Sequence, residues 1–302
     1  METRRLGRTN LEVSRLGAGL AEIGNNLTLA DESIAADVLN SALDGGITFL
    51  DTAACYGISE ALIGRTIAHR RDEYTLATKC GHVTGSYEGE PWTAKTVADS
   101  IDRSLQRMKT DRVDLVQLHS CGVDVLEKGE VIEALLAARD AGKTRFVGYS
   151  GDNEAAMWAV ESGIFDTLQT SFNLVEQRAY TKGLLAKAKE QDIGIIIKRP
   201  IANGAWGADK SPSGYANNYF ARAQTMAAQG PLPNAPENRI KLALGFTLAH
   251  EEPDTLIVGT RNPDHMRANL GWMEEGLSLH PETVAELRRR FEALDKNWSQ
   301  LG

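Results

Sequence analysis

The sequence has few cysteines and no long apolar run. Its three cysteines, Cys55, Cys80 and Cys121, are scattered and too few for the disulfide framework of a small secreted protein. No stretch approaches the roughly 20 apolar residues of a membrane-spanning helix, and the opening residues METRRLGRTN lack the apolar centre of a secretory signal. We therefore expect a cytoplasmic protein with no membrane partner.

The chain also has fewer basic than acidic residues. The chain has 33 Lys and Arg against 41 Asp and Glu, which gives a formal net charge of −8. Without a basic run there is little electrostatic attraction to nucleic acid, so no nucleic-acid partner is expected. Closely spaced pairs of metal ligands are missing as well, which argues against a structural metal site. An anionic ligand would have to be held by local positive groups.

What the sequence does contain is a regular alternation of short apolar runs with longer amphipathic segments. Eight strands alternating with eight helices predict a parallel sheet that closes into a (β/α)8 TIM barrel, an α/β fold, with residues 1–302 in one domain. The predicted strands are 15–19, 47–50, 74–78, 113–118, 145–149, 167–170, 193–197 and 255–258. The predicted helices are 31–43, 59–69, 93–108, 125–141, 153–162, 181–191, 238–250 and 263–276.

Three segments lie outside this alternation. Residues 1–14 contain a predicted β-hairpin without a helix partner, available to plug the bottom of the barrel. Residues 200–237 form a predicted long loop after the seventh strand, rich in Gly, Pro, Asn and Ser. Such a loop is either a lid over the active face or a mobile surface insertion, and the sequence favours neither. Residues 280–299 form a predicted terminal helix.

Chemically useful side chains stand where the predicted strands end, and these ends converge on one face of a TIM barrel. Asp51 and Tyr56 follow the second strand, Lys79 the third and His119 the fourth. An ammonium lowers the pKa of a nearby phenol, so Lys79 would make Tyr56 a better acid, and Asp51 would keep Lys79 charged. His119 would hydrogen-bond and orient a substrate oxygen. This set has an acid but no good nucleophile, which favours hydride addition to a carbonyl group with a dinucleotide cofactor.

Several motifs in this order resemble the aldo-keto reductase family. They are Asp51-Thr-Ala-Ala-Cys-Tyr56-Gly, Ala77-Thr-Lys79, Leu118-His119, Gly148-Tyr-Ser150, Gln169-Thr-Ser-Phe-Asn173 and Ile257-Val-Gly-Thr-Arg-Asn-Pro, ending in Asn269. The resemblance implies a (β/α)8 barrel and NAD(P)H as the cofactor. It implies Tyr56 as general acid, Lys79 and Asp51 as its tuning pair, and His119 as the orienting group.

The resemblance also implies a cofactor site along the remaining strand ends. Ser150 and Gln169 would hold the nicotinamide carboxamide, and the segment after the eighth strand would hold the adenosine half. The cofactor-binding residues expected in this way are Ser150, Gln169, Lys198, Arg199, Gly259, Thr260, Arg261, His265 and Asn269.

The chain departs from the family pattern at this site. Lys198 stands where many members have an aromatic side chain, and Gly151 follows Ser150 in place of Asn. Ala268 precedes Asn269, and His265 stands where Arg is frequent. Arg261, together with Thr260, is then the best phosphate contact, and it favours NADP(H) over NAD(H).

Other interpretations stay open. Lys79 or Lys198 could form the Schiff base of a barrel aldolase, or the chain could be a cofactor-sensing accessory subunit with slow turnover. The loop residues Trp92, His82 and Trp206 line a substrate pocket or serve only in loop packing. Oxidation of Cys80 or Cys121 is a further hypothesis, with loss of activity as its consequence. The substrate is expected to be a small carbonyl compound or alcohol of unspecified identity, and the oligomeric state is not predicted.

Overall fold

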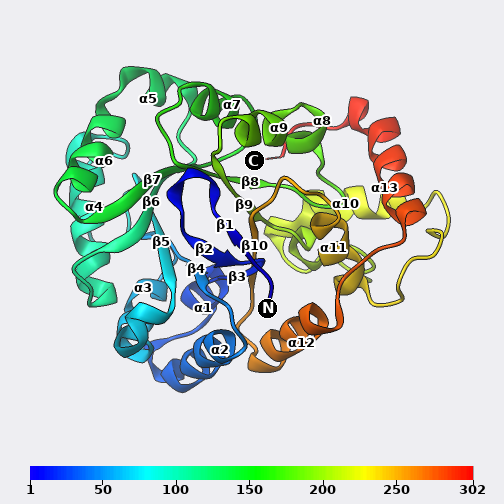
Figure 1. Ribbon diagram of the computed structural model, residues 1–302, viewed down its shortest axis with the longest axis horizontal. Helices are drawn as coiled ribbons and strands as arrows, with labels where there is room; N and C mark the ends of the chain where they lie inside the picture. Colours follow the sequence, from blue (N-terminus) through cyan, green and yellow to red (C-terminus); the bar gives the residue numbers. More distant parts are fainter. Residues whose placement is uncertain (302) are drawn as a thin grey trace.

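The computed structural model describes residues 1–301, and its centre is a closed barrel of eight parallel strands (Figure 1). In barrel order, β10 is followed by β3, β4, β5, β6, β7, β8 and β9, which pairs again with β10. The strands are β3 (Leu16–Gly19), β4 (Phe49–Asp51), β5 (Thr75–Cys80), β6 (Val113–His119), β7 (Thr144–Ser150), β8 (Thr167–Ser171), β9 (Gly194–Lys198) and β10 (Thr255–Gly259). The predicted (β/α)8 barrel is confirmed.

Helices surround the barrel, because each parallel connection must return the chain to the same end of the sheet (Figure 1). They are α1 (Ala21–Asn26), α2 (Glu32–Asp44), α3 (Ser59–Thr66), α4 (Ala94–Met108), α5 (Val123–Lys128), α6 (Glu130–Asp140), α7 (Asn153–Glu161), α8 (Arg178–Thr181), α9 (Leu184–Glu190), α10 (Asn217–Ala227), α11 (Arg239–Leu248), α12 (Pro263–Glu275) and α13 (Pro281–Leu294). No helix in residues 1–301 is long and apolar enough to cross a membrane.

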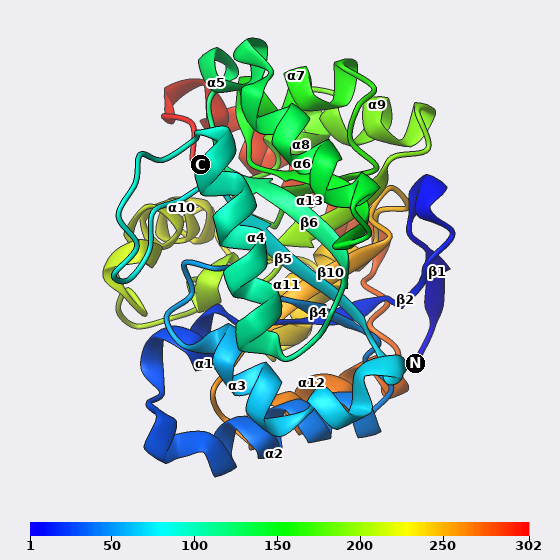
Figure 2. The ribbon, with the colours of Figure 1, turned by 90° about the vertical axis from the view of Figure 1, so that its left-hand side faces the viewer.

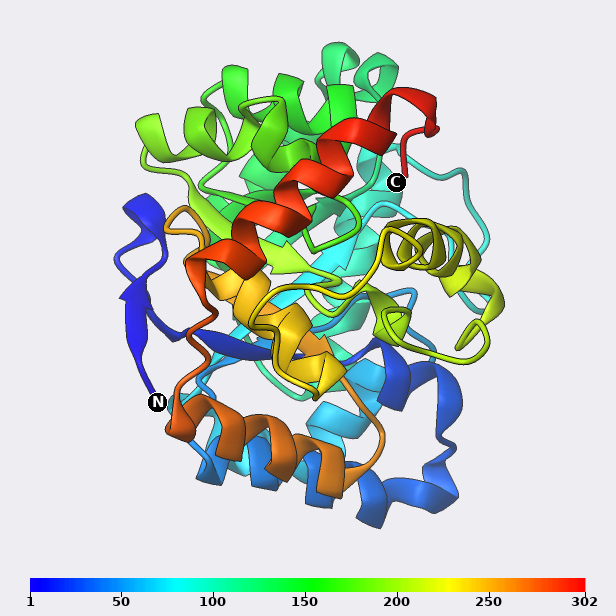
Figure 3. The same ribbon diagram turned by 90° about the vertical axis from the view of Figure 1, so that its right-hand side faces the viewer.

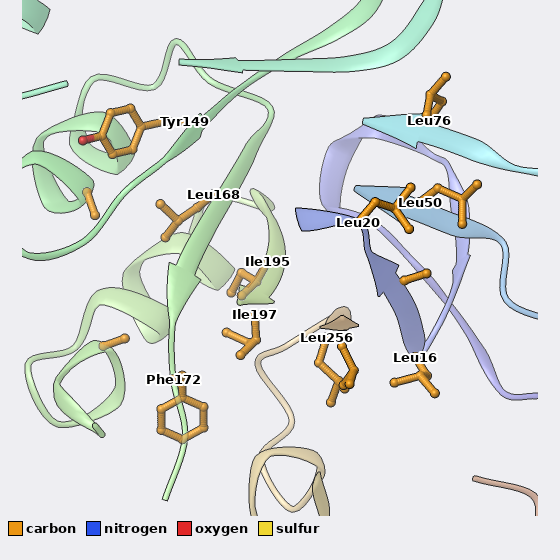
Figure 4. Packing of buried hydrophobic residues seen from close by; sticks show 14 of the residues in the cluster. Leu16, Leu20, Leu50, Leu76, Tyr149, Leu168, Phe172, Ile195, Ile197 and Leu256 are labelled. Atoms are coloured by element: carbon orange, nitrogen blue, oxygen red, sulfur yellow. The ribbon is translucent and has the colours of Figure 1, made fainter. Parts of the chain in front are cut away.

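The strands are buried on both faces, as parallel strands in barrels usually are. In β9, Ile195 and Ile197 point outward into the large core between barrel and helices, where Figure 4 shows them with Leu168 and Leu256. Ile196, between them, belongs instead to the smaller core inside the barrel. Successive side chains of a strand point to opposite faces, so the apolar residues of β9 contribute to both cores.

The N-terminal hairpin closes one end of the barrel (Figure 2). It consists of β1 (Thr3–Arg5) and β2 (Glu12–Ser14), joined by a short 3-10 turn. Leu6, Leu11 and Val13 are buried in the inner core with Phe49 and Ile196. The hairpin therefore supplies apolar side chains that fill the bottom of the barrel.

One predicted helix is broken and another begins late. The predicted helix 125–141 is split into α5 and α6 at Gly129, which has a φ of +77°. The predicted helix 181–191 corresponds to α9, which begins after Gly183, with a φ of +78°, and the first residue of the prediction, Thr181, is the last residue of α8. Glycine adopts this left-handed conformation at little cost, and it ends a helix. The short helix α1 after β3 was not predicted.

The segment 200–237, predicted to be a loop, contains helices. It contains α10 and two short 3-10 helices, Ala202–Gly204 and Gly214–Ala216. Figure 3 shows α10 at the end of the barrel opposite the hairpin, with α13 running along the side. The predicted terminal helix is α13 followed by one 3-10 turn, Asp295–Asn297.

Candidate active site

Three neighbouring strands bring the predicted tetrad together. Asp51 ends β4, Lys79 is the penultimate residue of β5, and His119 ends β6. The register pairs Asp51 with Ala77 and Lys79 with Gln117, so the three strand ends lie side by side. Tyr56 follows in the loop after β4.

Asp51 and Lys79 form a buried ion pair. Lys79 Nζ lies 2.6 Å from Asp51 Oδ2 and also donates to the Thr52 carbonyl at 2.9 Å, and the two side chains are only 1% and 2% exposed. Burial opposes the charge on Lys79, but the Asp51 carboxylate, with smaller contributions from Tyr56 and Cys55, offsets it, so the pKa of Lys79 is raised. Gln117 Nε2 donates to the other Asp51 oxygen at 3.3 Å. Sequence reasoning missed Gln117, whose only signal is its place two residues before His119 on the same strand.

Tyr56 lies against this ion pair. Lys79 Nζ is 4.9 Å from the centre of the Tyr56 ring, and a turn from Ala53 to Tyr56 fixes the backbone of the loop. Burial raises the pKa of Tyr56, and the Lys79 charge offsets this only in part. The expected net lowering of that pKa is wrong in this structure, because desolvation of the phenolate outweighs the neighbouring ammonium.

His119 is held neutral beside Tyr56. The two ring centres are 5.7 Å apart in an edge-to-face arrangement. Burial, reinforced by the cations Lys79, Lys198 and Arg199, lowers the pKa of His119 to about 2. A neutral imidazole carries a single N–H, so His119 can donate one hydrogen bond to a substrate oxygen but is no proton reservoir.

Ser150 and Gln169 meet at the ends of β7 and β8. Ser150 Oγ donates to Gln169 Oε1 at 2.7 Å. The amide nitrogen of Gln169 is buried and has no hydrogen-bond partner among residues 1–301. A buried donor without a partner is costly, and a carboxamide oxygen would satisfy it. These residues therefore suit the amide group of a nicotinamide.

Lys198 and Arg199 share a buried carboxylate that the sequence did not single out. Lys198 Nζ is 2.9 Å from Asp152 Oδ2, and Arg199 is 3.8 Å from the same oxygen. Burial lowers the pKa of Lys198 against the pull of Asp152. Arg199 also donates to Tyr219 of α10 at 3.2 Å, which ties the segment 200–237 to the barrel rim. Asp152 lies two residues past the end of β7, outside any motif.

The segment after β10 forms a polar rim. Gly259 pairs with Gly19 at the strand end, and the backbone N–H of Asn262 donates to Thr260 Oγ1 at 3.0 Å. Arg261 is exposed and lines an open cavity of about 450 Å³ together with Asn26, Leu27, Asp31, Ile34, Asn262 and Pro263.

His265 and Asn269 lie one turn apart on α12, so both are on one face of the helix. His265 is exposed and Asn269 is buried. Arg261 and the N-terminus of α12 are groups that suit a phosphate. Glu22 of α1, which sequence reasoning missed, lies close to this site: burial raises its pKa, and Arg261 and His265 offset this only in part.

Of the three predicted pocket residues, His82 lies beside His119 and Trp92 lies beside His82. The His82 ring is 5.0 Å from His119 and 4.8 Å from Trp92, measured between centres. Trp92 packs over Gly81, where any side chain would collide with the indole. Trp206 is half-buried against the large core.

The three cysteines differ in exposure. Cys80 and Cys121 are buried, and burial raises the pKa of both thiols, that of Cys121 to about 12. Because the thiolate is the form that is oxidised, their burial speaks against the predicted redox role. Cys55 is half-buried, and its Sγ lies 3.3 Å from His119 Nδ1.

Comparisons with known proteins agree on one family. A family model described as "Aldo/keto reductase family" matches residues 15–290. L-galactose dehydrogenase of Arabidopsis thaliana is 28% identical over 97% of this chain and 95% of its own length. NADH-specific methylglyoxal reductase of Escherichia coli is 25% identical over 96% of this chain and 98% of its own. The solved holo structure of aldo-keto reductase AKR11C1 from Bacillus halodurans superposes with a TM-score of 0.81, at 25% identity, over 96% of each chain.

Proposed function

The chain belongs to the aldo/keto reductase family, and we propose that it is an NAD(P)H-dependent oxidoreductase that reduces an aldehyde or ketone with Tyr56 as general acid. The observation that carries this proposal is the buried Asp51–Lys79 pair beneath the Tyr56 ring, next to a neutral His119. Family membership supports carbonyl reduction by an oxidoreductase, and the roles of single residues are inferred from their geometry.

Tyr56 supplies the proton in this scheme. Its raised pKa keeps the phenol protonated at neutral pH, so it is ready to donate to a carbonyl oxygen as negative charge develops there. The Lys79 ammonium then stabilises the phenolate that remains. His119 donates a hydrogen bond to the same oxygen and orients it. Water returns a proton to Tyr56 after the alcohol leaves.

The cofactor residues would hold a nicotinamide dinucleotide along the rim. When bound in reduced form, this cofactor supplies the hydride that reaches the carbonyl carbon. Ser150 and Gln169 would bind its carboxamide, with Lys198 and Arg199 at the tip of β9. The remaining contacts come from the segment after β10, from Gly259 to Asn269.

We propose NADP(H) over NAD(H) because Arg261 is exposed beside the cavity at the start of α12. Its guanidinium would form a charge-assisted hydrogen bond to a 2′-phosphate.

The geometry weighs against the Schiff-base alternative. A lysine must lose its proton to attack a carbonyl, but Lys79 is paired with Asp51 at 2.6 Å and its pKa is raised. Lys198 is paired with Asp152 at 2.9 Å, but burial lowers its pKa, so the geometry weighs most strongly against Lys79. Borohydride trapping with a carbonyl compound would reveal a covalent adduct if either lysine acted in this way.

A spectrophotometric assay tests the proposal. The purified protein is mixed with NADPH or NADH and a panel of aldehydes and ketones, and the absorbance of the reduced nicotinamide is followed. We expect consumption that depends on the carbonyl compound and is faster with NADPH. Cofactor binding without consumption for any compound would contradict the proposed activity and favour the accessory-subunit alternative. Faster consumption with NADH would contradict only the cofactor preference.

A further inference from the structure

Cys55 touches the one histidine of the tetrad. Its Sγ lies 3.3 Å from His119 Nδ1, within reach of a hydrogen bond to sulfur. This contact occupies Nδ1 of the ring. The contact at Nδ1 thus leaves Nε2 as the ring nitrogen available to a ligand.

We propose that Cys55 is a positioning residue that holds His119 in the tautomer with its hydrogen on Nε2. A neutral imidazole has one N–H. If the Cys55 thiol donates to Nδ1, the hydrogen is on Nε2 and can be donated to a substrate oxygen. If instead Nδ1–H donates to sulfur, Nε2 is a bare acceptor that repels a carbonyl oxygen. The inference rests on the proposed role of His119 as a hydrogen-bond donor.

The surroundings keep both partners of this contact uncharged. Burial raises the pKa of Cys55, so the thiol keeps its hydrogen. Burial also lowers the pKa of His119 to about 2, so the ring is neutral and carries a hydrogen on one nitrogen only. The neighbouring rings of Tyr56 and His82 approach His119 edge to face and provide packing. The Cys55 thiol is therefore available as a donor to Nδ1, and this is the arrangement that leaves the hydrogen on Nε2 for the proposed donor role of His119.

Nuclear magnetic resonance measures the tautomer directly. Histidine is labelled with the heavy nitrogen isotope, the His119 signals are assigned by their loss in His119→Asn, and long-range proton–nitrogen correlations show which nitrogen carries the hydrogen. The variants are Cys55→Ala, which removes the donor, and Cys55→Ser, whose hydroxyl is a stronger donor. Cys121→Ala, another cysteine close to His119 in sequence, is the matched control.

The wild type, Cys55→Ser and Cys121→Ala should carry the hydrogen on Nε2. Cys55→Ala should show a mixture of tautomers and lose about two- to tenfold in kcat/KM, the rate equivalent of one weak hydrogen bond. A wild-type ring protonated on Nδ1 would overturn the inference, as would a Cys55→Ala ring that stays fully protonated on Nε2. The spectra need no turnover, so they separate failure of this inference from failure of the proposed function.

Discussion

His250 is a buried histidine that the fold holds in its neutral form. Its ring lies between those of Phe172, Tyr180 and Phe246, with centres 4.7 to 5.0 Å away. Nδ1 is 2.8 Å from the Phe246 carbonyl, and Nε2 accepts from Arg288 at 3.3 Å. An acceptor at Nε2 and a donor at Nδ1 require the neutral ring. Burial, with help from Arg288, lowers the pKa of His250 to about 4.

This histidine should make stability depend on pH. Between pH 6.5, the ordinary value, and about 4, the unfolded chain binds a proton that the folded chain does not. His250 alone should therefore lower the free energy of unfolding by about 2 to 3 kcal/mol as the pH drops through this window, and His119, whose pKa is lowered further, adds to the fall. Chemical denaturation at several pH values measures it. His250→Phe should flatten this part of the curve, and the exposed His69→Gln should not. An unchanged curve for His250→Phe would contradict the prediction.

At the residue scale, the sequence indicates which groups meet but not every partner. Asp51, Lys79 and His119 could be predicted because each ends a recognisable strand. Asp152 could not, because its pairing with Lys198 depends on how β7 and β9 approach across β8. The pKa of Tyr56 was misjudged for a similar reason: sequence reveals a neighbouring charge, but not the burial that opposes it.

At the scale of elements, the N-terminal hairpin packs closely against the barrel at Gly7. Gly7 has a φ of +48°, and a Cβ there would lie 2.1 Å from the backbone nitrogen of Gly194 at the start of β9. The hairpin therefore approaches the barrel too closely for any side chain at this turn. Gly142, after α6, also has a positive φ, but a Cβ there would meet nothing within 4 Å.

Alanine substitutions at Gly142 and Gly7 should distinguish the cost of a positive φ alone from the cost of a positive φ combined with a steric clash. Gly142→Ala should cost about 1 kcal/mol, from the backbone conformation alone. Gly7→Ala should cost about 3 kcal/mol or more, since the hairpin must also move out of the inner core. Chemical denaturation of both variants tests this. An equal decrease in the free energy of unfolding for the two variants would show that the close packing at Gly7 does not contribute to stability.

The regular elements could be predicted because their apolar periods are clear. Strand β9 and helix α4 are examples, and the Thr93 side chain caps the first turn of α4. Helix α10 was missed because it lies in a segment whose Gly, Pro, Asn and Ser content indicates a loop. Its position depends on distant contacts, such as that between Arg199 and Tyr219, which local sequence does not reveal.

At the scale of the whole molecule, a buried charge cluster joins three distant parts of the chain. Glu176, after β8, accepts from Arg178 at 2.9 Å and from Arg222 of α10 at 2.5 Å. Both arginines also donate to the carbonyl of Ser299 near the C-terminus. All three charged side chains are buried. The cluster thus holds α10 and the C-terminal tail against the barrel.

Removing the Glu176 charge should loosen this assembly. Glu176→Gln leaves the buried Arg222 without its counter-ion and Arg178 with Asp295 as its remaining carboxylate, and we expect a loss of about 3 kcal/mol in the free energy of unfolding. The exposed Glu190→Gln is the control and should change little. If Glu176→Gln unfolds at the wild-type denaturant concentration, the cluster does not stabilise the fold.

The convergence of strand ends is the whole-molecule feature that sequence predicts best. A parallel barrel gathers all its carboxyl ends on one face, so residues 51, 79 and 119 come together whatever the loops do. The loops are where prediction stops, because their shape follows from packing rather than from a period. The substrate pocket belongs to that part of the chain.

The most direct test of the account compares wild type with Tyr56→Phe, using a carbonyl compound that the wild type reduces. Consumption of reduced nicotinamide and cofactor affinity are measured for both. Loss of the phenol should lower kcat by at least about a hundredfold, the usual contribution of a general acid, while cofactor Kd stays within about twofold because Ser150, Gln169 and the rim are untouched. Wild-type kcat in Tyr56→Phe would contradict the central claim.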